Sequence, residues 1–239
     1  MSQQDYNITW DLIKHFHKAK GHVIIKNMLS QNIETEAKFI IPDPATFETL
    51  QQTSNLGDFE LNPVGVKNIV DRYFDTAEMA LFKAGFACRI RSTKDQQILN
   101  LKSLAPAEGQ IHRRQEIEMD VNTEQPQGWA EGEAKILVMG IIGQAPLQTL
   151  FTLYQTRSKL HVYFQERLVI ELSLDKVSLH QANTIDYLGL EAELIEDGTE
   201  TDLTRFTETL QRHWPLEADA QSKFERGLAT CKKLRKVPL

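Results

Sequence analysis

A strict two-residue alternation of charged and apolar side chains runs through seven segments of this chain and constrains its fold more than any other feature. In residues 32–39 (NIETEAKF), Glu34, Glu36 and Lys38 alternate with mostly apolar residues. Successive side chains of a β-strand point to opposite faces, so this spacing predicts a strand with one charged face. Six further segments repeat the pattern: 86–92, 99–103, 112–119, 156–160, 170–175 and 189–194.

The charged faces differ from an ordinary solvated sheet face. A half-exposed antiparallel sheet also alternates apolar and polar residues, so one such strand identifies no site. Here the polar positions hold few Ser, Thr or Gln residues, and like charges recur in tandem, as Arg89 with Arg91 and Glu191 with Glu193. Neighbouring like charges repel, so their recurrence indicates a bound counter-charge.

The order of the segments predicts an α+β fold. Most of the predicted strands follow one another as antiparallel hairpins, and helices are expected over 42–53, 77–85, 133–143 and much of the chain after 200. Strands with one charged and one apolar face suit a closed or strongly curved sheet. An up-and-down barrel with a polar interior satisfies the pattern, because interior and exterior residues alternate along every strand of a barrel.

Composition excludes several classes of protein. The formal net charge of −6 argues against a general nucleic-acid partner. The two cysteines, Cys88 and Cys231, form neither a metal-ligand spacing nor a disulfide framework, so a reducing cytoplasm is the expected location. No apolar run approaches the length of a membrane span, and no membrane partner is expected.

A series of motifs, taken in order, resembles the CYTH superfamily, the triphosphate tunnel metalloenzymes. The segment IETEAKF resembles the ExExK signature of that superfamily, and DRYFDT (71–76) is similar to its second-strand signature. The later matches are LFKAGFACRIRS (81–92), LNLKS (99–103), RRQEIE (113–118), LSLDKV (172–177), LEAELIEDG (190–198) and SKFERGL (222–228). The resemblance covers residue 33 to about residue 230, and its appearance is closest to the bacterial inorganic triphosphatases.

The resemblance implies an eight-stranded antiparallel β-barrel that forms a tunnel, with helices packed outside. One part of such a tunnel is cationic and holds a linear triphosphate, and another is acidic and holds a divalent metal, Mg²⁺ or Mn²⁺. It implies a domain over residues 31–232, preceded by a partly helical extension (1–30) and followed by a tail (233–239).

The resemblance also implies roles for individual residues. Glu34, Glu36 and Lys38 would lie where the bond breaks, with the two carboxylates toward metal and Lys38 toward phosphate. The implied phosphate-binding residues are Lys38, Arg89, Arg91, Lys102, Arg114, Arg157, Lys159 and Lys223. The implied metal ligands are Glu34, Glu36, Asp175, Glu191 and Glu193, while Glu116, Glu118 and Glu171 would position basic residues or bind metal through water.

The implied activity is metal-dependent hydrolysis of a triphosphate, with inorganic tripolyphosphate cleaved to pyrophosphate and phosphate as the favoured reaction. Thiamine triphosphate and nucleoside triphosphates are alternative substrates. An adenylate cyclase that releases cyclic AMP and pyrophosphate is a second alternative, and a non-catalytic polyphosphate or nucleotide binding protein is a third. The expected partner is a small-molecule triphosphate, and the expected state is a monomer or homodimer.

Overall fold

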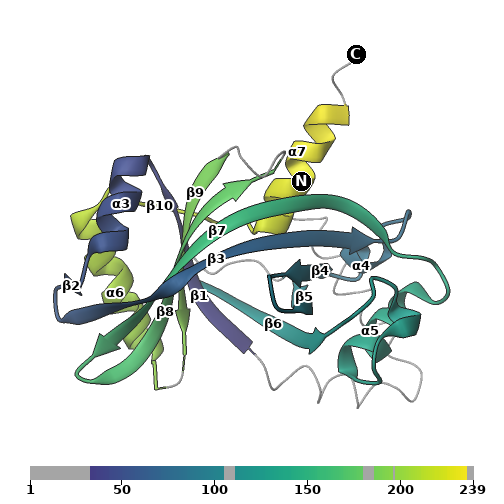
Figure 1. Ribbon diagram of the computed structural model, residues 1–239, viewed down its shortest axis with the longest axis horizontal. Coiled ribbons are helices and arrows are strands. Elements are labelled where there is room, and N and C mark those ends of the chain that lie inside the picture. The colour runs from purple at the N-terminus through teal and green to yellow at the C-terminus, as the bar shows by residue number, and fades with distance from the viewer. Residues whose placement is uncertain (1–32, 105–110, 180–185, 196, 236–239) are drawn as a thin grey trace. The chain divides into compact units, whose positions relative to one another are not determined.

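The computed structural model describes residues 33–104, 111–179, 186–195 and 197–235 (Figure 1). The predicted N-terminal extension lies outside these residues. The strands are β1 (Ile33–Ile41), β2 (Asn55–Leu56), β3 (Phe59–Asp75), β4 (Phe86–Ser92), β5 (Gln97–Ser103), β6 (Ile111–Asp120), β7 (Gln148–Phe164), β8 (Arg167–Ser178), β9 (Tyr187–Leu194) and β10 (Glu217–Ala218). The helices are α3 (Pro44–Gln52), α4 (Ala80–Lys83), η1 (Pro126–Gly128), α5 (Glu133–Ile142), α6 (Glu200–His213) and α7 (Lys223–Arg235).

The strands form one sheet whose order of pairing returns to its start. The order is β10–β1–β6–β5–β4–β3–β7–β8–β9, with β2 beside β3 and a further pairing of β1 with β9. Eight strands therefore close a cycle of hydrogen-bonded pairs. The pairs β1–β9, β4–β5, β5–β6, β7–β8 and β8–β9 are antiparallel. This topology confirms the predicted α+β class and the antiparallel sheet of eight principal strands.

The described chain divides into two compact units. The first unit contains residues 72–104 and 114–150, and the second contains 34–71, 111–113 and the described residues from 151 onward. Each unit has its own apolar core.

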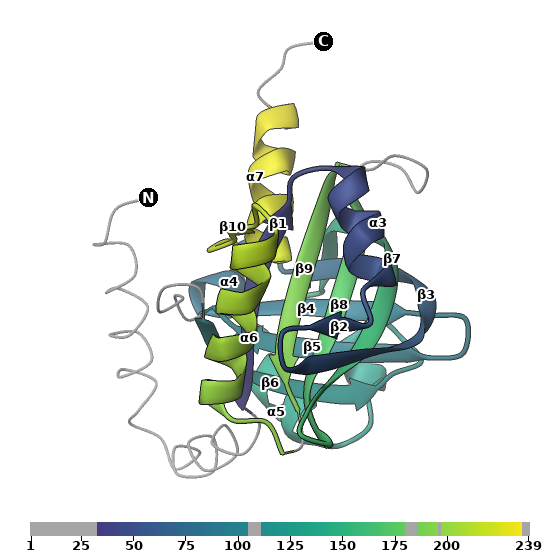
Figure 2. The ribbon, with the colours of Figure 1, turned by 90° about the vertical axis from the view of Figure 1, so that its left-hand side faces the viewer.

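In the second unit, α3 and α6 pack on the apolar face of the sheet. Phe47 of α3 and Phe206 of α6 are buried against side chains of β1, β7, β8 and β9, and Figure 2 shows both helices on the same side of these strands. A reciprocal pair of hydrogen bonds between Thr199 and Asp202 caps the start of α6. On the opposite face of the same strands, odd-numbered positions hold most of the charged residues: Arg157, Lys159, Glu171, Asp175, Glu191 and Glu193.

In the first unit, α5 covers the apolar face of β4 and β5. Val138 and Ile142 of this helix pack with Cys88, Ile90 and Leu99, all of which are buried. Burial raises the pKa of the Cys88 thiol, so this cysteine is a neutral core residue, as its position in an apolar strand predicts.

Two details of the strands concern the start of β3 and the turn from β7 to β8. Strand β3 begins at Phe59, and its chain stays extended through Pro63 and Gly65, although proline and glycine normally interrupt strands. The turn between β7 and β8 consists of Gln165 and Glu166, both with positive φ (50° and 66°). Two consecutive residues of this kind match the twist of a tight hairpin.

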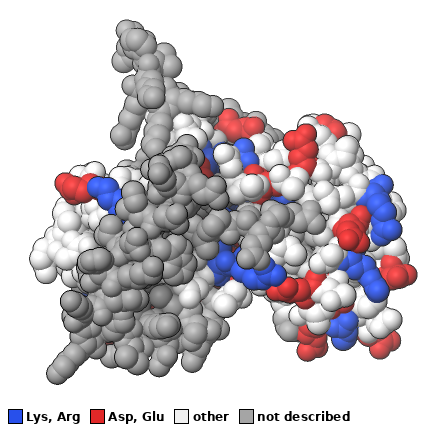
Figure 3. Space-filling model, turned by 180° about the vertical axis from the view of Figure 1, so that it is seen from behind, with Lys and Arg blue, Asp and Glu red and all other residues white. Residues whose placement is uncertain are grey.

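Among the described side chains that Figure 3 leaves uncovered, basic and acidic residues are interspersed. Among the helices of the described part of the chain, none combines the length and apolar character needed to cross a lipid bilayer.

Candidate functional site

Polar rows cross four neighbouring strands of the second unit on the face opposite α3 and α6. The strand registers place Glu36 beside Glu193, Glu193 beside Glu171, and Glu171 beside His161. The next row is Lys38, Glu191, Ser173 and Lys159, and the third contains Asp175 beside Arg157. The registers thus identify the neighbours of these residues across the sheet, which alternation along a single strand does not give.

Glu191 is the centre of a network of ion pairs. Its carboxylate oxygens lie 2.6 Å from a guanidinium nitrogen of Arg157, 2.6 Å from Lys223 Nζ and 3.6 Å from Lys38 Nζ. Asp175 accepts two hydrogen bonds from Arg157, at 2.8 and 2.6 Å, and lies 2.9 Å from Lys223 Nζ. We call Lys38, Arg157, Lys223, Glu36, Asp175 and Glu191 the ion-pair cluster.

Burial and charge act in opposite directions on the cluster. Burial alone would raise the pKa of Glu191, but Lys223, Lys38 and Arg157 together hold that pKa well below its usual range. Burial likewise opposes ionisation of Asp175, and Arg157 and Lys223 lower the pKa of its carboxyl. The two carboxylates in turn raise the pKa of Arg157 against the effect of its burial. Asp175, Glu191 and Arg157 are therefore ionised at neutral pH.

The lowered carboxyl pKa values predict an acid-sensitive fold. Asp175 and Glu191 bind protons more weakly in the folded state than in the unfolded chain, where carboxyl pKa values are about 3.9 to 4.3. Their contribution to stability is complete above about pH 5 and is lost as the pH falls through the folded pKa values. Urea unfolding at pH 7, 5, 4 and 3 should show a falling free energy below pH 5. The Glu191→Gln variant should show a shallower decline, and equal slopes would contradict the assignment.

The row of Glu36, Glu193 and Glu171 offers the oxygen ligands that Mg²⁺ and Mn²⁺ prefer. Residues directly opposite on neighbouring strands have Cβ atoms about 5 Å apart, so these like charges lie close enough to repel. Glu36 lies 2.9 Å from Lys38 Nζ, and Glu171 lies 2.5 Å from Lys159 Nζ. Within the described residues, no three acidic, histidine or cysteine side chains converge as a ready-made metal-binding group. The carboxylates of this row are therefore suitable metal ligands, and two of them, Glu36 and Glu171, lie beside lysines.

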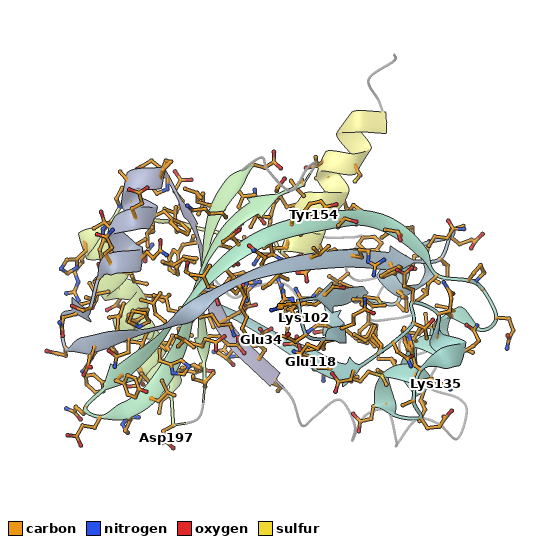
Figure 4. The ribbon with its side chains drawn as sticks, in the orientation of Figure 1. Glu34, Lys102, Glu118, Lys135, Tyr154 and Asp197 are labelled. Carbon is orange, nitrogen blue, oxygen red and sulfur yellow. The ribbon has the colours of Figure 1, made fainter. Side chains whose placement is uncertain are left out.

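A separate polar face lies on β4, β5 and β6 of the first unit. The registers place Arg89 beside Asn100 and Asn100 beside Glu118, and they place Lys102 beside Glu116. Lys102 Nζ lies 3.3 Å from Glu116, and Figure 4 labels Lys102 and Glu118 where β5 and β6 run side by side. Arg91 and Arg114 belong to the same face by alternation, and Arg89 and Arg114 are buried. The predicted basic residues of these strands thus share one face within this unit.

The chain was compared with known protein families to find one with the same sequence pattern. Residues 32–228 match the CYTH domain family. The chain belongs to the CYTH family. The predicted resemblance is confirmed over nearly the same residues.

Solved structures show the same fold at low sequence identity. A protein from Hippeastrum, described as an adenylyl cyclase candidate with a dominant triphosphatase activity, is 20% identical with a TM-score of 0.65, over 86% of this chain and 98% of that one. An adenylate cyclase candidate from Bacillus halodurans is 22% identical with a TM-score of 0.57, over 82% and 97%. The PH1819 protein from Pyrococcus horikoshii is 20% identical with a TM-score of 0.52, over 82% and 99%. No curated protein sequence matches this chain.

The start of α7 explains how a helical lysine joins a cluster on strands in this CYTH chain. The backbone N–H of Asp219 donates to the carbonyl oxygen of Lys38 at 2.9 Å, which fastens the segment before α7 to β1. Ser222 and Glu225 then exchange hydrogen bonds in a capping box at the start of the helix. Lys223 is thereby placed in the first turn of α7, within reach of Asp175 and Glu191.

Asn100 is a buried polar residue of the CYTH domain for which the sequence predicted no role. Its side-chain N–H₂ donates to Glu118 at 2.8 Å and also to Glu116. Replacing it with Asp would remove both donors and add a third carboxylate, so we expect Asn100→Asp to lower the free energy of unfolding by about 2 kcal/mol. Urea unfolding at pH 7 measures this. The exposed Asn55→Asp is the control, and equal effects of the two changes would contradict the role.

Asp71 and Gln155 were also missed by sequence reasoning, although a signal existed. Ile69 and Asp71 of β3 are buried and alternate with the more exposed residues 68, 70 and 72, and Asp71 is the charged member of that buried pair. Gln155 precedes Arg157 by two residues and so shares its face of β7. Testing every strand for single charged residues, and not only for tandem ones, would have found Asp71.

Proposed function

We propose that this CYTH protein is a metal-dependent triphosphatase that hydrolyses inorganic tripolyphosphate to pyrophosphate and phosphate. The observation that supports this most directly is the ion-pair cluster beside the carboxylate row Glu36, Glu193 and Glu171. Cations and carboxylates alternate there on adjacent strands. The phosphate oxygens of a polyphosphate can pair with the basic side chains in place of the carboxylates. The carboxylates are then available to bind metal.

The basic side chains would bind the substrate. Lys38, Arg157 and Lys223 carry three positive charges within one network, which suits a chain of phosphates better than a single carboxylate. The planar guanidinium of Arg157 can grip two phosphate oxygens at once. The family resemblance assigns phosphate binding also to Lys159 of this unit, and to Arg89, Arg91, Lys102 and Arg114 of the first unit.

The carboxylates would hold the metal. We assign Glu34, Glu36, Asp175, Glu191 and Glu193 as candidate ligands, with Mg²⁺ or Mn²⁺ as the ion. A bound divalent metal neutralises charge on phosphate oxygens and lowers the pKa of water. The lysines and arginines stabilise the charge that develops on the leaving phosphate, and no side chain needs to act as a covalent nucleophile.

A substrate panel tests the proposal and its alternatives. Purified protein is incubated with tripolyphosphate, ATP, thiamine triphosphate or pyrophosphate, each with Mg²⁺ or Mn²⁺, and phosphate release is measured. We expect tripolyphosphate to have the highest kcat/KM. A higher kcat/KM for ATP or thiamine triphosphate would move the assignment to that substrate. Formation of cyclic AMP from ATP would change the assignment from a hydrolase to an adenylate cyclase. Binding without turnover would indicate a non-catalytic binding protein.

The remaining expectations belong to the same proposal. We expect a small-molecule substrate and no nucleic-acid partner, which is consistent with the net charge of −6. We expect a cytoplasmic location, which is consistent with the cysteine usage. We also propose residues 31–232 as the catalytic domain, in a monomer or homodimer. Size-exclusion chromatography with light scattering would determine the oligomeric state.

A further inference from the structure

Asp71 and Gln155 form a buried polar pair beside the ion-pair cluster. Asp71 on β3 is 0% exposed and Gln155 on β7 is 3% exposed. The side-chain N–H₂ of Gln155 donates to Asp71 Oδ2 at 2.6 Å. Because an ionised carboxylate only accepts hydrogen bonds, this contact fixes which end of the amide faces Asp71. The carbonyl oxygen of Gln155 therefore points elsewhere, and it has no hydrogen-bond partner among the described residues.

A buried carboxylate such as that of Asp71 is stabilised by nearby positive charge, because burial by itself strongly disfavours ionisation. A cation on the strand next to β3 is Arg157, which lies two residues from Gln155 on the same face of β7. The carboxylate of Asp71 is among the groups that raise the pKa of Arg157, after the opposing effect of burial and the larger effects of Asp175 and Glu191. Asp71 thus lies within electrostatic reach of this guanidinium.

The other partners of Arg157 are residues that the proposed function needs for another purpose. Its guanidinium donates two hydrogen bonds to Asp175 and one to Glu191. Both carboxylates are candidate metal ligands. If Asp175 and Glu191 bind metal, Arg157 loses the hydrogen bonds that hold its side chain in one conformation. An unrestrained arginine side chain must then lose conformational entropy when it binds phosphate.

We propose that Asp71 and Gln155 are positioning residues that keep Arg157 on the polar face of the sheet when Asp175 and Glu191 bind metal. This inference rests on the proposed function. Asp71 supplies the fixed negative charge, and Gln155 holds the carboxylate of Asp71 in place by its hydrogen bond. The pair contributes little to the position of Arg157 while Asp175 and Glu191 contact the guanidinium. Its contribution is largest when those two carboxylates bind metal.

The test measures binding of a methylene-bridged tripolyphosphate analogue, which is not hydrolysed, by isothermal titration calorimetry. Titrations are done in EDTA and in Mg²⁺, with the full chain in each case. Gln155→Leu removes the hydrogen bond to Asp71 without changing the net charge. We expect this variant to bind the analogue about tenfold more weakly than the wild type in Mg²⁺, the size expected for loss of a hydrogen bond to a charged group, and within about twofold of it in EDTA. In steady-state assays KM should rise by a larger factor than kcat falls, because Arg157 already contacts the phosphates in the ground state.

Asp71→Asn is the second variant. It tests the same inference if the Gln155→Leu protein does not fold. Removing a negative charge near an anion site should by itself tighten binding, so weaker binding of the analogue in Mg²⁺ would be specific to the loss of positioning. The matched control is Thr156→Val, which breaks a 3.1 Å hydrogen bond to Asn68 between the same two strands on the opposite face. The control should bind the analogue as the wild type does.

The outcomes separate this inference from the proposed function. Weakening limited to Mg²⁺ supports the positioning role. Equal weakening in EDTA and Mg²⁺, or no weakening in either, would overturn it while leaving tripolyphosphate binding by the wild type intact. A wild-type protein that binds the analogue in neither solution would overturn the proposed function, and this inference with it.

Discussion

Replacing Glu36 with Gln is expected to reduce kcat for tripolyphosphate by roughly 10³-fold, the size of losing several kcal/mol of transition-state stabilisation. Gln keeps the shape of the side chain, and its amide oxygen can occupy the position beside Lys38 Nζ that the Glu36 oxygen holds at 2.9 Å. What is lost is one negative charge in the row of Glu36, Glu193 and Glu171, which the proposed function assigns to metal. Affinity for the non-hydrolysable analogue in EDTA should stay within about threefold of the wild type, because the cations remain.

The measurement combines kcat with metal affinity. A titration of Mn²⁺ by its electron paramagnetic resonance signal would report metal binding without turnover, and the Glu36→Gln variant should bind Mn²⁺ more weakly than the wild type. The control is Glu208→Gln, which removes the same charge from the exposed face of α6. A Glu36→Gln variant with wild-type kcat would remove this residue from the site.

The alternation of charged residues was enough to predict which side chains share a face, but it could not predict their partners across the sheet. The hairpin of β7 and β8 illustrates the reason. Its two-residue turn pairs Phe164 with Arg167, and if that register continued, Arg157 would lie opposite Leu174. An irregularity between Val162 and Tyr163 shifts the register by one residue and places Arg157 opposite Asp175. The central ion pair of the cluster thus depends on a bulge without a sequence signature.

Long-range pairing was equally hidden from the sequence. Lys38 and Glu191 are opposite each other only because β1 pairs with β9, far along the chain. Periodicity predicts faces within one strand, whereas pairing of distant strands depends on the whole topology. The family motifs supplied that topology by resemblance, since they ordered the strands of a known fold. They supplied no role for Asn100, Asp71 or Gln155, whose buried hydrogen bonds appear only in three dimensions.

The ion-pair cluster balances three cations against three carboxylates, and this balance has a consequence for stability. Glu191 contacts all three cations, Lys38, Arg157 and Lys223. Removing one charge of a buried ion pair leaves its partners without a counter-charge. Such changes lower the free energy of unfolding by several kcal/mol. We therefore expect Glu191→Gln to lower the free energy of unfolding at pH 7 by about 3 kcal/mol, the low end of that range because Asp175 still pairs with Arg157 and Lys223.

The same variant should be rescued by the ligand that the cluster is proposed to bind. With Glu191 neutral, three neighbouring cations repel one another, and an added polyphosphate supplies the missing negative charge. Thermal unfolding in EDTA should therefore show a larger rise in Tm on adding tripolyphosphate for Glu191→Gln than for the wild type. Sulfate at equal ionic strength is the control for screening, and Glu208→Gln is the control for loss of a carboxylate. An equal rise in Tm for both proteins would mean that polyphosphate does not bind at Lys38, Arg157 and Lys223, and the phosphate-binding residues would have to be sought elsewhere in the chain.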